Sequence, residues 1–230
     1  MNETLDYIEN AIDNNQHIIR EDLNAAKVVW MKKDRDYAKL IIDANLINAD
    51  GQSVVTASKW LGNPIKERVS GIDLMENLIR LAYKKGYTIF FFGAREEIVQ
   101  TVVEKYSNEY SSSIIAGYRN GYFTTEDEAI IAEEIRQSGA NIVFIGISSP
   151  LKEQFVHNYK NKMNVNLLMG VGGSFDVIAG KVKRAPLWMQ RSGLEWFYRF
   201  LQEPRRMWKR YLYTNSMFIW LVFKEKLLKK

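Results

Sequence analysis

The sequence predicts an α/β fold with a mainly parallel sheet. Up to about residue 180, short apolar runs alternate with helical patterns, and three of the runs end in glycine after an almost continuous apolar stretch. Runs of this kind are typical of strands that helices cover on both faces. After residue 180 the strand pattern stops, and the chain continues with helical patterns rich in aromatic and basic residues. We therefore expect a Rossmann-like domain over residues 1–185, with helices on both faces of its sheet, and a helical appendage over residues 186–230.

The predicted strands are short and lie between helices with recognisable ends. Strands are expected at residues 45–48, 88–93, 113–117, 141–146 and 165–170, with a weaker candidate at 17–19. In "IDLMENLIRLAYKKG", Leu74 and Leu78 lie at helical spacing and Gly86 marks the end of the helix. In "TTEDEAIIAEEIRQSG", Thr125 and Glu128 have the spacing of a capping box.

The C-terminal segment carries most of the positive charge. Residues 181–230 contain 13 basic and 3 acidic residues, a net charge of +10, whereas residues 1–180 contain 19 basic and 24 acidic residues, a net charge of −5. Four of the six tryptophans also fall in this segment. Pro186 and Pro204 fit the starts of helices, because the first turn tolerates proline. Basic, aromatic helices of this kind indicate an anionic surface as a partner.

The composition argues against several kinds of chemistry and location. The chain has no cysteine, which excludes disulfides, thiolate nucleophiles and cysteine-based metal sites, and its two histidines argue against a histidine-rich metal centre. The N-terminal residues lack the layout of a signal peptide, and the most apolar stretch, residues 217–223, is too short to cross a membrane. We therefore expect a cytoplasmic protein without a metal or other cofactor.

Polar residues and glycines follow the predicted strands. In parallel sheets, ligands bind beyond the carboxyl ends of the strands. Asp50, in "NADGQSVV", has two interpretations: Asp-Gly is common turn punctuation, but a carboxylate at this edge could also act as a base. The further candidates at this edge are Gly93, Ser149, Lys152, Glu153, Gly172, Gly173 and Asp176.

Two loops at this edge have alternative explanations. "GVGGSFD" at residues 170–176 could hold a phosphate on its backbone N–H groups, but a tight turn explains its glycines equally well. "GISSPLKEQF" at residues 146–155 could orient the hydroxyls of a sugar or nucleotide, or simply cap a helix. The residues alone leave both alternatives open.

Arginines could supply positive charge without a metal. Arg68 is either a solvated charge or, near the strand ends, a partner for a diphosphate through paired N–H donors. Arg199, Arg206 and Arg210 are spaced by about two turns and one turn of a helix. One helix face would present all three if Pro204 does not break the helix.

Taken in order, these segments resemble the WecG/TagA/CpsF glycosyltransferase family, also called glycosyltransferase family 26. The resemblance runs from "DLNAAKVV" at residues 22–29 through "NADGQSVV", "RVSGIDL", "FFGA", "GYRNGYF", "GISSPLKEQF" and "GVGGSFDVIAGKVKRAP" to "GLEWFYRFLQEPRRMWKRY" at residues 193–211. The ordered set is specific, especially its last two segments.

The resemblance implies inverting transfer of a sugar, without an essential metal, from a UDP-sugar to a polyprenyl-diphosphate-linked sugar at the inner face of a bacterial membrane. In the teichoic-acid branch the donor is UDP-N-acetylmannosamine, whereas other branches use UDP-N-acetylmannosaminuronic acid or UDP-glucose. The family's carboxylate base maps onto Asp50 and its phosphate-facing arginine onto Arg68. The appendage would then be peripheral on the anionic membrane surface, and Arg199, Arg206 and Arg210 could reach the acceptor's diphosphate.

Two positions depart from the family pattern. The family's Thr-x-Asn reads "DLN" at residues 22–24, so Asp22 precedes the retained Asn24, and its Pro-Lys-Gln-Glu reads "PLKE" at 150–153, so Lys152 replaces the usual glutamine before Glu153. Both positions resemble donor-side contacts, and a charge at each changes which sugar fits.

A nucleic-acid-binding module is the alternative outside enzymes. It would explain the basic, aromatic tail but would leave the loops at the sheet edge without a role, so we expect no nucleic-acid partner. Assembly into a homo-oligomer stays open at this point.

Overall fold

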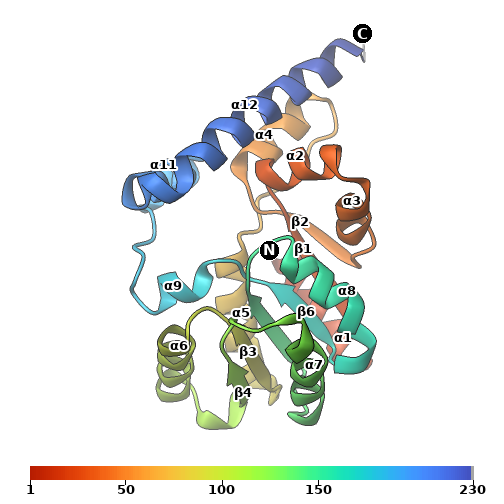
Figure 1. Ribbon diagram of the computed structural model, residues 1–230, viewed down its shortest axis with the longest axis vertical. Coiled ribbons are helices and arrows are strands. Elements are labelled where there is room, and N and C mark those ends of the chain that lie inside the picture. The colour runs from red at the N-terminus through yellow and green to blue at the C-terminus, as the bar shows by residue number, and fades with distance from the viewer. Residues whose placement is uncertain (229–230) are drawn as a thin grey trace. The chain divides into compact units, whose positions relative to one another are not determined.

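The computed structural model describes residues 1–228, except for the side chains of Arg191, Arg206, Lys209 and Arg210 (Figure 1). Every predicted strand is present, within a few residues of its expected bounds: β1 (Ile18–Leu23), β2 (Leu46–Ala49), β3 (Ile89–Gly93), β4 (Ile115–Arg119), β5 (Ile142–Gly146) and β6 (Leu167–Gly170). They form one sheet in the order β2-β1-β6-β5-β3-β4. The pairs β1–β6, β6–β5, β5–β3 and β3–β4 are parallel, which confirms the predicted sheet type.

Helices connect the strands. Before the tail they are α1 (Asn2–Asp13), α2 (Ala25–Lys33), α3 (Arg35–Ile42), α4 (Gln52–Trp60), α5 (Gly71–Lys85), α6 (Glu96–Glu109), α7 (Glu128–Gln137), α8 (Leu151–Met163) and α9 (Ser174–Ile178). Two short 3₁₀ turns, η1 (Ser112–Ile114) and η2 (Thr125–Asp127), precede β4 and α7. The capping box lies one residue earlier than predicted, at Thr124 and Asp127, because the η2 turn comes before the α-helix.

Helices pack on both faces of the sheet, as the sequence predicts. On one face, Phe92 of β3 packs against Phe155 of α8, with ring centroids 5.3 Å apart. On the other face, Phe91 contacts Tyr106 of α6 and Phe175 of α9. Successive side chains of a strand point to opposite faces, so the continuous apolar run of β3 fills both layers of the core.

The C-terminal segment is helical, but its arginines are not on one helix. It forms α10 (Leu187–Arg191), α11 (Glu195–Gln202) and α12 (Pro204–Leu228). Pro186 is the N-cap residue of α10 and Pro204 begins α12, so both predicted helix starts are confirmed. Because Pro204 starts a new helix, Arg199 lies on α11 while Arg206 and Arg210 lie on α12, and the expectation of one shared helix face is wrong.

The chain divides into two compact units, which are not consecutive in sequence. The first unit comprises Met1–Glu21, Asp43–Leu46 and Gly71–Lys181, and the second comprises Asp22–Ile42, Ile47–Ser70 and Val182–Lys230. Within the second unit, α12 packs on α2, and Phe218 is buried in a core cluster that includes Val29 and Val55. The tail is therefore part of the hydrophobic core of the second unit.

The tail does not provide a membrane span. Within the part of the chain that the structure describes, every helix is too short or too polar to cross a bilayer. The functional division of the chain at residues 185 and 186 stays a prediction.

Candidate active site

Asp50 lies directly after β2, at the carboxyl end of the strand. Its backbone N–H donates to the carbonyl of Leu23 at 3.0 Å. The N-cap residue of α4 is Gly51, whose backbone is extended with a φ of −86°. The Asp-Gly pair is therefore not a positive-φ turn here. About a third of the Asp50 side chain is exposed (31%), so its carboxylate can reach a ligand.

Arg68 lies beside Asp50 in the second unit. Its Nε donates to the backbone carbonyl of Asp50, and its Nη2 lies 3.7 Å from Oδ1 of the same residue. The same Nη2 lies 2.5 Å from Oε2 of Glu195, the first residue of α11. Two carboxylates thus face one guanidinium, and the formal charge of these three side chains is −1.

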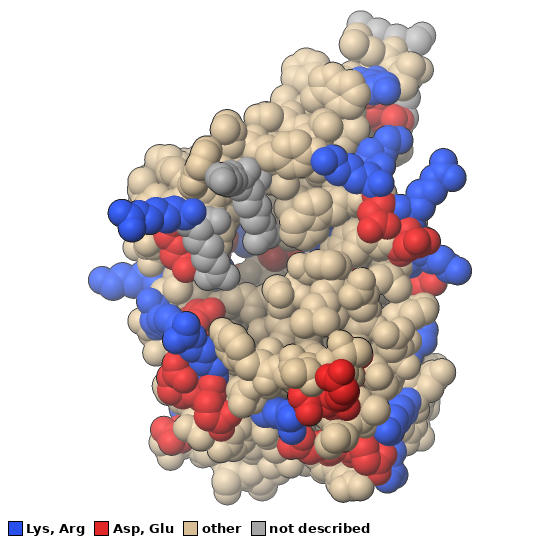
Figure 2. Space-filling view, in the orientation of Figure 1, with Lys and Arg blue, Asp and Glu red and all other residues tan. Residues whose placement is uncertain are grey.

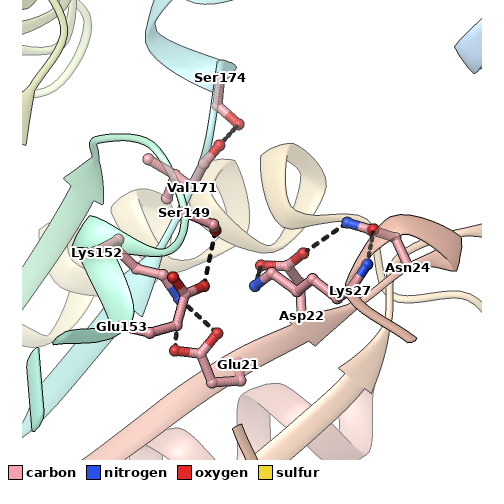
Figure 3. Close-up of polar contacts among 9 residues, drawn as sticks. All are labelled: Glu21, Asp22, Asn24, Lys27, Ser149, Lys152, Glu153, Val171 and Ser174. Atoms are coloured by element: carbon pink, nitrogen blue, oxygen red, sulfur yellow. Dashed lines mark hydrogen bonds and ion pairs between the residues drawn. The ribbon is translucent and has the colours of Figure 1, made fainter. Parts of the chain in front are cut away.

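Asp22 and Asn24 lie where β1 ends and α2 begins, also in the second unit (Figure 3). Asn24 is the N-cap residue of α2, and its side-chain oxygen accepts from the N–H of Lys27 at 3.1 Å. Its side-chain nitrogen donates to Asp22 at 3.2 Å, and Nζ of Lys27 pairs with Asp22 at 2.9 Å. Leu23, which lies between Asp22 and Asn24 in the sequence, accepts the backbone hydrogen bond from Asp50. The predicted residues at 22–24 and at 50 are therefore neighbours within the second unit.

A buried group of charges lies in the first unit, at the end of β1 and the start of α8. Figure 3 shows the Lys152 ammonium between two carboxylates: Nζ lies 2.5 Å from Oε2 of Glu21 and 3.1 Å from Oε1 of Glu153. Ser149 Oγ donates to Oε1 of Glu153 at 2.8 Å. The side chains of Lys152, Glu21 and Glu153 are only 4%, 2% and 0% exposed. Buried charges persist only when paired and hydrogen-bonded, and this arrangement supplies both conditions.

Gly170 makes room for the Lys152 side chain. A Cβ on this last residue of β6 would lie 2.9 Å from Cδ of Lys152. The charge that Lys152 brings to this position is therefore already compensated within the protein. Its predicted role, and those of Ser149 and Glu153, in substrate binding stay predictions.

The predicted glycines lie at the strand ends, and Gly93 allows close backbone packing there. Gly93 ends β3 with a φ of +136°, and a Cβ on it would lie 2.4 Å from the carbonyl carbon of Gly146. Gly172 has a φ of +52°, and Gly173 is the N-cap residue of the five-residue α9. In the same turn, Ser174 Oγ donates to the carbonyl of Val171 at 2.6 Å (Figure 3). The positive φ values of Gly93 and Gly172 favour glycine at these two positions, and phosphate binding by the loop at residues 170–176 stays a prediction.

The remaining predicted residues form ion pairs with other neighbours or lie outside the described residues. Oδ1 of Asp176 lies 4.0 Å from Nζ of Lys181, and Nε of Arg199 lies 3.7 Å from Oε2 of Glu203. The side chains of Arg206 and Arg210 lie outside the described residues. Across residues 1–228, as far as the structure describes them, no group of three or more His, Asp or Glu side chains is arranged to hold a metal ion.

Comparisons with known proteins assign the chain. The model of the glycosyl transferase WecG/TagA/CpsF family matches residues 1–230. The chain belongs to this family. It is 39% identical, over 209 residues, to an N-acetylglucosaminyldiphosphoundecaprenol N-acetyl-beta-D-mannosaminyltransferase of Bacillus subtilis (strain 168), an alignment that covers 90% of this chain and 80% of the relative. A protein of the same name from Bacillus spizizenii is 37% identical over 176 residues, which are 76% of this chain and 67% of the relative.

Membership of the WecG/TagA/CpsF family confirms the resemblance seen in the sequence and identifies the chain as a glycosyltransferase. It also favours the enzyme over the nucleic-acid-binding alternative. The structure adds two acidic residues that sequence reasoning missed, Glu21 beside Lys152 and Glu195 beside Arg68. Glu195 carried one signal in the sequence, because it is one of only three acids in the basic tail.

Proposed function

We propose that this chain transfers N-acetylmannosamine from a UDP-sugar to N-acetylglucosaminyl-diphosphoundecaprenol, with inversion, in the synthesis of a cell-surface polymer such as teichoic acid. The observation that carries the proposal is the 39% identity over 90% of the chain to a relative named for this transfer, combined with an accessible carboxylate at Asp50. The acceptor hydroxyl oxygen forms a bond to the anomeric carbon, and the bond from that carbon to the UDP oxygen breaks.

Asp50 is the group that takes the proton in this mechanism. As the acceptor oxygen attacks, its proton passes to the Asp50 carboxylate, and UDP leaves from the opposite face of the sugar with the electron pair of the broken bond. General-base assistance of this kind contributes about 10² to 10⁴ in rate. In this proposal Arg68, whose Nη2 lies 3.7 Å from Oδ1 of Asp50, stabilises the negative charge that develops on the departing diphosphate.

The donor sugar is tested with a panel of nucleotide sugars. Purified protein is incubated with a short-chain lipid-diphosphate-N-acetylglucosamine acceptor and either UDP-N-acetylmannosamine, UDP-N-acetylmannosaminuronic acid or UDP-glucose, and glycolipid product is measured. The proposal predicts product from UDP-N-acetylmannosamine well above that from the other two. Preference for UDP-glucose would instead assign the chain to exopolysaccharide synthesis.

The tail is the proposed contact with the anionic inner face of the membrane. In α12, the side chains of Trp208, Leu212 and Trp220 are 48%, 67% and 53% exposed and line a shallow apolar groove. Lys224 lies over the Trp220 ring, 5.1 Å from its centroid. On the face shown in Figure 2, the part of the molecule that contains α12 is mostly uncharged, with basic and acidic side chains toward its C-terminal end. Exposed aromatic residues with lysines beside them suit the headgroup layer of an anionic bilayer.

Point variants test the membrane contact better than truncation. Removal of the chain after residue 190 would also remove Phe218, which is buried in the core of the second unit. The double variant Leu212→Ser with Trp220→Ser changes only exposed side chains of α12. It should lose binding to phosphatidylglycerol vesicles in a flotation assay while it keeps the thermal unfolding midpoint of the unmodified protein. Unchanged vesicle binding would contradict the proposed contact.

A further inference from the structure

The guanidinium of Arg68 is shared between two acidic residues of the second unit. Nη2 lies 2.5 Å from Oε2 of Glu195 and 3.7 Å from Oδ1 of Asp50, while Nε donates to the backbone carbonyl of Asp50. The side chains of Arg68 and Glu195 are 18% and 32% exposed. An ion pair with this exposure is accessible to a competing anion from solvent.

A carboxylate and a phosphate use the same donors of a guanidinium. Arginine presents planar N–H groups that bind either anion through paired hydrogen bonds. In this structure one of those groups, Nη2, is held by Glu195. Because Asp50 and Glu195 both lie near Nη2, the three side chains together offer no net positive charge to an incoming diphosphate. Arg68 can therefore direct all of its charge and its paired N–H donors to the diphosphate only when Glu195 no longer contacts Nη2.

Glu195 is the first residue of a helix that has no buried residue of its own. This helix, α11, contacts its neighbours α10 and α12. The link between α10 and α11 contains Gly193, with a φ of +73°. A shift of α11 away from Arg68 would thus remove no buried apolar side chain of α11 from the interior.

We propose that Glu195 is a displaceable counter-ion, which competes with the diphosphate of the UDP-sugar for Arg68. The proposal rests on the proposed function, since it assumes that a UDP-sugar binds beside Arg68. It assigns the acid that begins α11 a role in setting the affinity for the donor nucleotide. It also couples the tail to the donor site, because a nucleotide diphosphate and the Glu195 carboxylate of α11 compete for the charge and the N–H donors of the same guanidinium.

Titration calorimetry with UDP on the full chain tests the proposal through four variants. Glu195→Gln removes the competing charge and should bind UDP about fivefold more tightly than the unmodified chain, since exposed ion pairs are worth up to about 1 kcal/mol. Glu225→Gln, an equal change of charge at an exposed position of α12, should leave the UDP affinity unchanged. Arg68→Gln should weaken UDP binding, and in that background Glu195→Gln should bring no gain.

Each result separates the inference from the proposed function. If the unmodified chain fails to bind UDP at all, the proposed function falls, and the inference with it. If the unmodified chain binds UDP but Glu195→Gln binds equally or less tightly, the inference is overturned while the proposed function stands, and Glu195 instead orients Arg68. A gain in Glu225→Gln equal to that in Glu195→Gln, or a gain that persists without Arg68, would also overturn the inference.

Discussion

The buried charges around Lys152 make a strong prediction about stability. Lys152→Met keeps an unbranched side chain of similar length, so it fills the space beside Gly170 and loses only the ammonium group. Glu21 and Glu153, which are 2% and 0% exposed, would then both lose the buried ammonium group that they contact. Removal of one partner from a buried ion pair typically costs about 3–5 kcal/mol. We expect the free energy of unfolding of the variant to fall by about this amount.

Urea unfolding followed by far-ultraviolet circular dichroism measures this change. Lys160→Met, in the same helix but outside the buried group, is the matched control and should change the free energy of unfolding by less than about 0.5 kcal/mol. The double variant Glu21→Gln with Lys152→Met also removes one of the two buried carboxylates that contacted the ammonium group, and it should recover at least half of the loss. A loss below about 1 kcal/mol in Lys152→Met would show that the Lys152 ammonium is not part of a buried ion pair, because a solvated lysine costs little to replace.

Further predictions concern three single positions. Tyr106 Oη is buried without a hydrogen-bond partner among the described residues, so Tyr106→Phe should leave the free energy of unfolding unchanged or raise it by up to about 1 kcal/mol in urea titrations. Burial also raises the pKa of the Tyr106 phenol above its ordinary value. Above about pH 10 this tyrosine should therefore ionise in the unfolded chain but not in the folded protein, so the free energy of unfolding should be highest below about pH 10 and decrease above it. The decrease should be smaller in Tyr106→Phe. Gly93→Ala should lower the thermal unfolding midpoint by several degrees, because the new Cβ would clash with the backbone of Gly146 and because Gly93 has a φ of +136°, which alanine rarely adopts. An unchanged midpoint would contradict this packing. Phe218→Ala should cost about 3–5 kcal/mol by chemical denaturation, because its ring is buried in the core of the second unit, and a cost below about 1 kcal/mol would show that α12 is not packed there.

Most of the fold could be predicted from the sequence because its signals are local. The apolar run of β3 and its final glycine indicate a buried parallel strand, and the structure confirms it. The strand β1 was only partly foreseen, because Arg20 and Glu21 interrupt its apolar pattern although both are buried. Charged residues inside a strand are stabilised by partners that are distant in sequence, and a local pattern cannot reveal them.

The candidate site was predictable only in part, for the same physical reason. Asp50 and Arg68 are 18 residues apart and could be placed near the sheet edge by the order of elements and by the family resemblance. Glu21 and Lys152 are 131 residues apart, and Arg68 and Glu195 are 127 residues apart. These pairs form only when distant segments of the chain come together in the fold. No local periodicity in the sequence reveals which distant residues will meet.

The most direct test of the account is the rate of sugar transfer by Asp50→Asn. Single-turnover transfer from UDP-N-acetylmannosamine to the lipid-diphosphate acceptor is measured beside UDP binding by calorimetry. If Asp50 is the base, transfer should slow by about 10² to 10⁴ while UDP still binds at least as tightly, because the base is lost and the nucleotide site is kept. Transfer by Asp50→Asn within about threefold of the unmodified enzyme would contradict the assignment of Asp50 as the base.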